Sequence, residues 1–137
     1  MDFRIWALLS ALFAGGTAVL AKKGVDGVPA NTALAVRVAF VCLFSFGLAF
    51  ASRQAQFSNL TKTNWLFLGL SAVATWLSWL CYFRALQMGD VARVAPIDKL
   101  SFVIAMILGI CILREKVDTK LIVGACLIVA GVLITLK

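Results

Sequence analysis

Five long apolar stretches, separated by short polar segments, make up almost the whole chain. They cover approximately residues 4–21, 31–52, 64–87, 92–113 and 118–136. Each is about as long as the ~20-residue helix that crosses a hydrocarbon core of ~30 Å. Because the bilayer core offers no water to the backbone, helices are the structure expected in such stretches. The pattern predicts an all-α integral membrane protein with five transmembrane helices, forming a single domain over residues 1–137.

The composition agrees with this interpretation. Hydrophobic residues make up 63% of the chain and charged residues 14%, which is more apolar surface than a small water-soluble domain buries. The net charge of +7 is not gathered into a basic run, so we expect no nucleic-acid partner. Basic residues beside apolar stretches are typical of membrane proteins. We expect a multi-pass protein of the bacterial inner membrane, in contact with the lipid bilayer.

The chain offers little to catalysis or to metal binding. It contains no histidine, and its cysteines lie inside the apolar stretches without a CxxC spacing, at positions 42, 81, 111 and 126. A zinc site or a disulfide framework is therefore not expected, and the cysteines are interpreted as small buried packing residues. No serine or cysteine lies beside a base. We expect no enzyme activity, no catalytic residues, no metal and no cofactor.

The basic residues in the connections and near the ends of the spans divide almost evenly between the two sides of the membrane. An odd number of spans places the termini on opposite faces. The N-terminal side carries Arg4, Arg53, Lys62, Arg114, Lys116 and Lys120, and the other side carries Lys22, Lys23, Arg84, Arg93 and Lys137. The usual signal for orientation is therefore missing. Two alternatives stay open, namely one orientation set by the order of insertion, or dual topology with pairing of inverted copies.

An ionisable side chain inside a span is costly, which makes Arg37 a candidate for function. It lies about two turns into the second stretch. Its side chain either faces a polar cavity or extends along its apolar stem to the headgroups. We favour the cavity, because lipid exposure at this depth is expensive. An arginine in a cavity would favour solutes that bear a carboxylate over cationic drugs.

Further candidates for substrate binding lie in the third and fourth stretches. Trp76, Trp79 and Phe83 share one helix face, which either lines a pocket or packs against a neighbour. Asp98 and Lys99 follow Pro96, where a helix loses a backbone donor. This charged pair belongs either to a distorted hinge with a substrate contact or to the start of a helix. Because consecutive spans are antiparallel, Arg84 and Asp98 are expected at similar depth and could form an ion pair.

The last stretch carries a small-residue motif. Gly124 and Gly131 are seven residues apart on one helix face, with Leu127 and Ile128 between them. Small residues allow a second helix to approach closely in a membrane. These residues therefore either form a dimer interface or pack within the chain.

Several motifs resemble known transporter families. The segment GACLIVAGV at 124–132 is similar to the dimerisation helix of small multidrug resistance transporters. The segments YFRALQMG at 82–89, VAPIDKLS at 94–101 and LREK at 113–116 resemble the EamA domain of the drug/metabolite transporter superfamily. EamA transporters typically carry two such five-helix units in inverted tandem. Since this chain carries one, the resemblance implies a homodimer, antiparallel if the topology is dual.

One departure from these families narrows the expected function. Small multidrug resistance transporters carry a glutamate in their first helix, and here Ala14 occupies that position. Drug/proton antiport by that mechanism is therefore not expected. The resemblance instead implies a transporter of small metabolites, amino-acid-like or other small organic solutes, working by alternating access. The alternatives are a subunit of a lipid-linked-sugar flippase and a non-transporting membrane subunit.

Five spans predict that reporter fusions to the two ends of one chain report opposite faces of the membrane. The measurement is the activity of a periplasmic and a cytoplasmic reporter at each terminus. Strong activity of both reporters at the same terminus indicates dual topology, and activity of one reporter alone indicates a single orientation. Termini found on the same face would contradict the five-span prediction.

Overall fold

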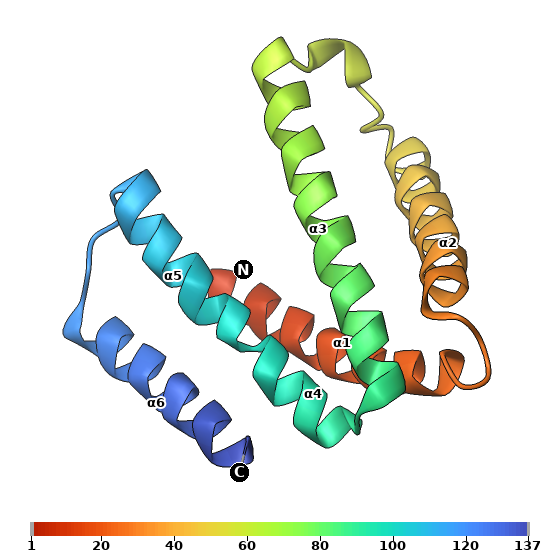
Figure 1. Ribbon diagram of the computed structural model, residues 1–137. Helices are drawn as coiled ribbons and strands as arrows, with labels where there is room; N and C mark the ends of the chain where they lie inside the picture. Colours follow the sequence, from red (N-terminus) through yellow and green to blue (C-terminus); the bar gives the residue numbers. More distant parts are fainter. Residues whose placement is uncertain (1, 137) are drawn as a thin grey trace. The chain divides into compact units, whose positions relative to one another are not determined.

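The computed structural model describes residues 2–136, and within that range every regular element is a helix (Figure 1). The contacts divide the chain into two compact units, Met1–Met88 and Gly89–Lys137, called here the first and the second unit. The first unit contains α1 (Phe3–Gly24), α2 (Ala30–Ala51), the 3₁₀ turn η1 (Phe57–Asn59) and α3 (Lys62–Met88). The second contains α4 (Val91–Asp98), α5 (Leu100–Leu113) and α6 (Thr119–Thr135).

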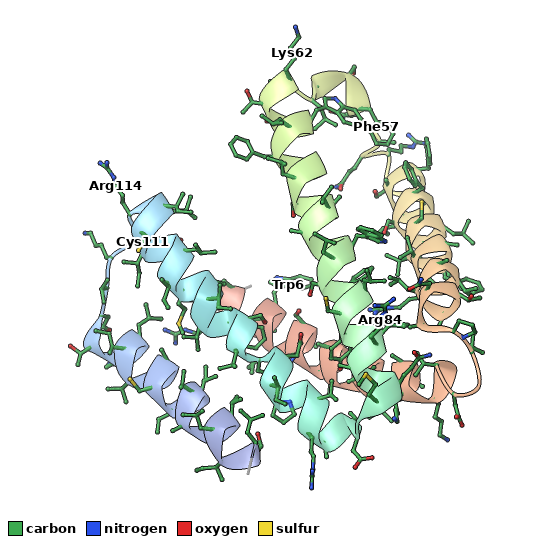
Figure 2. The ribbon with its side chains drawn as sticks, in the orientation of Figure 1. Trp6, Phe57, Lys62, Arg84, Cys111 and Arg114 are labelled. Atoms are coloured by element: carbon green, nitrogen blue, oxygen red, sulfur yellow. The ribbon has the colours of Figure 1, made fainter. Side chains whose placement is uncertain are left out.

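The predicted spans agree closely with these helices. Four helical segments of the described chain are long and apolar enough to cross a membrane, namely α1, α2, α3 and the α4–α5 segment Val91–Leu113. The fifth predicted span corresponds to α6, which has 17 residues. At 1.5 Å per residue this helix is ~26 Å long, at the short end of the range for transmembrane helices. Basic side chains extend from helix ends, as Lys62 and Arg114 do in Figure 2.

The fourth span is not one continuous helix, as the sequence pattern had suggested. It is interrupted at Lys99, where α4 ends and α5 begins. Pro96 lies in the last turn of α4 and cannot donate a backbone hydrogen bond. Around the break the chain uses tighter bonds between residues three apart, from Lys99 N to Pro96 O and from Phe102 N to Lys99 O, each 3.1 Å long. The distortion expected at the proline is therefore present, and it divides the span.

The first unit is built by α3 packing against both α1 and α2. Its buried side chains lie in the second half of α1, the α1–α2 connection, the start of α2 and the end of α3. They are Ala18, Val25, Ala30, Leu34, Phe83 and Leu86. The connection is a tight turn in which Gly27 has φ of +68°, a conformation that glycine adopts without strain. Pro29 then precedes the first turn of α2. The core is therefore concentrated at one end of the three helices.

In the second unit, α6 packs against both α4 and α5. The chain leaves α5 through Arg114, which has left-handed backbone angles, and Glu115 N donates to Gly109 O at 3.3 Å. This bond from the residue after the helix end to the last turn closes α5. Gly109 is buried at this turn, and Glu115 folds over it. The connection thereby returns the chain towards α6.

Most of the large apolar side chains are exposed in this single chain. Leu8, Phe44 and Leu48, for example, are each about 70% exposed. Apolar surface on this scale needs lipid or another protein to cover it. The prediction that the four cysteines are buried is wrong for the isolated chain, because all four are free and exposed. Their helices are apolar on nearly all sides, so hydropathy alone could not tell which face packs inward.

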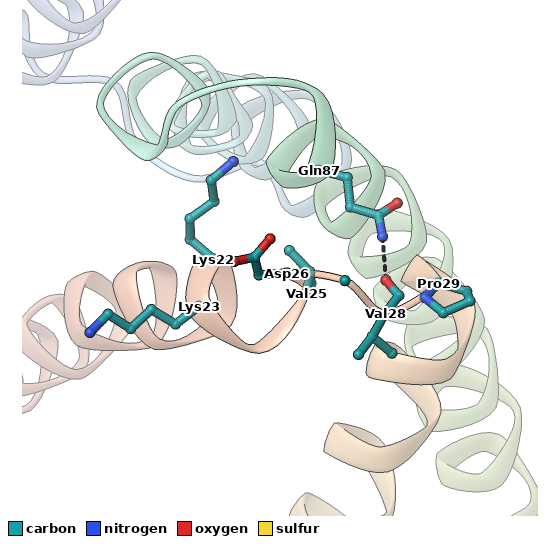
Figure 3. A pocket seen from close by; sticks show the side chains of 8 residues that line it. Lys22, Lys23, Val25, Asp26, Val28, Pro29 and Gln87 are labelled. Atoms are coloured by element: carbon teal, nitrogen blue, oxygen red, sulfur yellow. Dashed lines mark hydrogen bonds between the residues drawn. The ribbon is translucent and has the colours of Figure 1, made fainter.

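Two hydrogen bonds join the end of α3 to the α1–α2 region. Lys22 Nζ, near the end of α1, donates to Leu86 O at 2.5 Å. Gln87 Nε2 donates to Val28 O at 2.6 Å, as the dashed line in Figure 3 shows. The last carbonyl groups of a helix have no partner within the helix. A lysine beside them donates a hydrogen bond, and its charge interacts favourably with the helix dipole. We call these two bonds the α1–α3 clasp.

We expect Gln87→Leu to lower the thermal stability of the detergent-solubilised protein by about 0.5–1 kcal/mol, because the Val28 carbonyl loses its donor. The measurement is the unfolding midpoint from tryptophan fluorescence. Gln54→Leu is the control, since the Gln54 side chain is exposed and forms no hydrogen bond among the described residues. Equal midpoints for the two variants would show that the clasp does not stabilise the fold.

Candidate functional site

A pocket of about 530 Å³ lies in the first unit, between α1, α2 and the end of α3. Its size is within the range of ordinary small-molecule sites. The walls are mostly apolar, and the lining residues are Thr17, Leu20, Ala21, Gly24, Val28, Ala33, Val36, Arg37, Phe40, Val41, Phe44 and Phe83. Arg37 is the one ionisable residue in this lining.

Arg37 is brought into this pocket by α2 and is held against the aromatic residues of α3. The guanidinium carbon lies 4.4 Å from the centroid of the Trp79 ring and 5.5 Å from that of Phe83. Both distances are within the range of cation–π attraction. Phe83 is almost completely buried, at 2% exposure, so it forms a fixed surface for the cation. The cavity interpretation of Arg37 is thus compatible with the structure, and the arginine is partly buried rather than extended into open surroundings.

Arg37 forms no ion pair with a carboxylate within the described chain. The ion pairs among residues 2–136 join Arg4 to Asp2 and Lys99 to Asp98. The aromatic faces attract the cation, but they do not satisfy the N–H donors in the plane of the guanidinium. An arginine in apolar surroundings with unused donors is a suitable binding group for an anion.

The structure separates the members of the aromatic face predicted on α3. Trp79 and Phe83 contact Arg37, whereas Trp76 is 52% exposed and makes no ring contact among the described residues. Trp79 and Phe83 therefore belong to the candidate site, whereas Trp76 lies on the exposed surface. Arg84 lies on the same helix and its side chain is exposed.

Asp98 and Lys99 lie at the break of the fourth span, in the second unit. They form an ion pair with each other at 3.5 Å, and Lys99 Nζ lies 5.1 Å from the centroid of the Phe102 ring. Asp98 ends α4 and Lys99 precedes α5. Both earlier interpretations stay open, because the pair lies at a distortion and also at a helix start. A pairing of Arg84 with Asp98 would join the two units, and it stays a prediction.

The sequence reasoning missed two aromatic residues of α2 that line the pocket. Phe40 and Phe44 follow Arg37 by three and seven residues, so they share its helix face. Their rings are stacked with centroids 6.2 Å apart. This spacing was available in the sequence, but α2 is apolar all round, and nothing in the pattern distinguished this face from the others. Thr17 and Ala21 of α1 have small side chains, and they form part of the opposite wall.

A second, more polar pocket of about 620 Å³ adjoins the α1–α2 connection (Figure 3). It is lined by Lys22, Lys23, Asp26 and Gln87, together with Val25, Gly27, Val28 and Pro29. Val28 belongs to both pockets, so the two are neighbours. The polar pocket includes both bonds of the α1–α3 clasp through Lys22 and Gln87. The side chains of Lys22 and Gln87 in this pocket therefore help to hold the helix ends together.

The predicted dimer residues of α6 have little contact with the rest of the chain. A side chain added at Gly124 or Gly131 would meet nothing within 4 Å. Leu127 is 68% exposed, and Ile128 is partly buried. The glycines therefore do not serve close packing within the described part of the chain.

Apolar helices of membrane-spanning length define a multi-pass membrane protein, and its arginine-bearing pocket has the volume of a small-solute site. The model of the EamA-like transporter family matches residues 4–137. The chain belongs to this family of the drug/metabolite transporter superfamily, and it is a membrane transporter. The family resemblance of the sequence motifs is thereby confirmed.

A relative from Sinorhizobium sp has a sequence that is 44% identical over 134 residues, covering 97% of this chain and 95% of the relative. Its name is "Uncharacterized transporter in cobO 3'region". The two chains are therefore alike in length as well as in sequence. No solved structure matches this chain.

Proposed function

We propose that this protein carries small carboxylate-bearing organic solutes across a bacterial inner membrane, with Arg37 as the group that binds the carboxylate. The observation that carries the proposal is the position of Arg37, which lines an apolar pocket, faces the rings of Trp79 and Phe83, and has no carboxylate partner among residues 2–136. The bacterial origin of the 44%-identical relative supports the proposed location.

The energetics of a charge in the membrane favour this role. A cation in a low-dielectric site is costly unless an anion or several hydrogen bonds compensate it. The two aromatic faces offset part of that cost. A bound carboxylate would offset more of this cost, because a carboxylate accepts two parallel hydrogen bonds from a guanidinium and neutralises the positive charge. The same contact thus lowers the cost of burying the arginine and binds the solute.

We further propose that transport proceeds by alternating access in an antiparallel homodimer. One five-span unit, an even distribution of basic loop residues and an open glycine face on α6 all support this arrangement. In transporters built from inverted repeats, the solute site lies near the midplane where the two repeats meet. Two copies of this chain in opposite orientations would provide such a pair, with Gly124 and Gly131 allowing the close approach.

The other candidate residues have supporting roles in the proposed transport. Trp79 orients Arg37 by stacking, and Trp76 continues the same helix towards the exposed surface. Asp98 and Lys99 mark the interruption of the fourth span, where a helix with fewer regular bonds can bend as access alternates. Arg84 provides a second positive charge one residue beyond Phe83 on α3.

Arg37→Ala is expected to abolish transport of a carboxylate solute in proteoliposomes while the protein is still expressed and purified normally. The reason is the loss of the charged binding group in the pocket. Arg93→Ala is the matched control, because Arg93 is exposed on α4 and lies outside the candidate site. Unchanged flux in Arg37→Ala would remove this residue from the site.

Gly124→Leu and Gly131→Leu are each expected to shift the purified protein from dimer to monomer, because a bulky side chain prevents close approach of a second helix. Cross-linking in the membrane and the mass in detergent are the two measurements. Gly69→Leu serves as control, since Gly69 is equally open but lies on α3. Intact dimers in both α6 variants would count against this helix as the contact.

A further inference from the structure

We infer that the Arg37 pocket selects monocarboxylates with an apolar body and rejects amino acids, although both carry a carboxylate. This inference rests on the proposed role of Arg37 as the carboxylate-binding group. It goes further, because it assigns to the other lining residues the selection between monocarboxylates and amino acids. The basis is the chemistry of the lining, which provides one positive charge and no negative charge that would pair with a positive group on the solute.

The polar side chains of the lining are those of Arg37 and Thr17. No carboxylate is among the lining residues, so the ammonium of a bound zwitterion would find no ion-pair partner in this pocket. The acidic residue nearby in the sequence, Asp26, lines the neighbouring polar pocket instead (Figure 3). A desolvated ammonium without a partner is strongly disfavoured.

The cation already present adds to the discrimination. In an α-amino acid the ammonium is attached to the carbon next to the carboxylate. Binding the carboxylate to Arg37 would therefore bring the ammonium close to the guanidinium, and like charges at short range in a site of low dielectric repel each other. The faces of Trp79 and Phe83 are already engaged by Arg37. A cation–π contact with Phe40 or Phe44 would offset only part of the cost of desolvating an ammonium.

The remaining wall is suited to an aromatic or branched aliphatic group. Phe40 and Phe44 form a stacked pair on α2, and Phe83 faces the pocket from α3. Leu20, Val36 and Val41 complete an apolar surface. With about 530 Å³ available, a carboxylate at Arg37 leaves room for a body of phenyl size against these rings.

The test compares two ligands with the same carbon skeleton, 3-phenylpropionate and L-phenylalanine, which differ by the α-ammonium group. The full chain is reconstituted in nanodiscs, and binding of radiolabelled 3-phenylpropionate is measured with each compound as unlabelled competitor. Binding at equilibrium avoids the passive leak of weak acids through vesicles. We expect 3-phenylpropionate to compete at least about tenfold better than phenylalanine. We also expect Arg37→Ala to lose binding.

A substitution that places a carboxylate in the wall provides the reverse experiment. Thr17→Asp should raise the relative affinity for phenylalanine, because the ammonium gains a partner. Ser10→Asp is the matched control, since Ser10 lies seven residues earlier on the same face of α1 but is not part of the lining. The two variants add the same charge to the same helix.

The possible results separate the inference from the function on which it rests. Phenylalanine that competes as well as 3-phenylpropionate, with binding still dependent on Arg37, overturns the selectivity and leaves the carboxylate site in place. Binding that is the same in wild type and Arg37→Ala, or that is absent from both, overturns the carboxylate site itself and the inference with it. If Thr17→Asp does not fold, the comparison of ligands on the wild-type protein still decides the matter.

Discussion

An arginine among apolar helices must face something that accommodates its charge, and the first unit is organised around that requirement. α2 carries Arg37, and α3 provides the rings of Trp79 and Phe83 at 4.4 and 5.5 Å. α1 contributes small residues to the opposite wall, where larger side chains would fill the space. Because rings attract the cation without using its in-plane donors, the same arrangement holds the arginine in place and leaves it ready for an anion.

The packing of the first unit is concentrated where this site needs rigidity. The buried residues and the α1–α3 clasp lie around the last turns of α3, and Phe83 belongs to both the core and the pocket. Side chains elsewhere on these helices are largely exposed. In a membrane such surfaces meet lipid tails or other helices, and van der Waals packing rather than the exclusion of water decides between the two. An anchored end with exposed flanks is compatible with the alternating access proposed for this transporter.

The interruption of the fourth span shows how a local rule acts through the tertiary structure. Pro96 removes a donor wherever it occurs in a helix, but the extent of the break was decided by the turn that follows. The backbone N–H of Lys99 donates to Pro96 O, and Lys99 O accepts from Phe102 N, so each bond joins residues three apart. The Lys99 side chain forms an ion pair with Asp98. An ion pair between neighbouring residues reduces the cost of two charges close to a membrane span. The charged pair and the interruption therefore belong together.

The sequence by itself determined the spans, the helical class and the family, because the requirement for backbone hydrogen bonding in lipid leaves few alternatives. It also singled out Arg37, since a charge inside a span is expensive wherever its helix faces. It could not determine that Trp79 rather than Trp76 meets the arginine, that Phe40 and Phe44 line the pocket, or that Gln87 reaches Val28. Helices that are apolar on every side carry no periodic signal for the inward face. Only the rotation and contact of α1, α2 and α3 within the tertiary structure decided which residues meet.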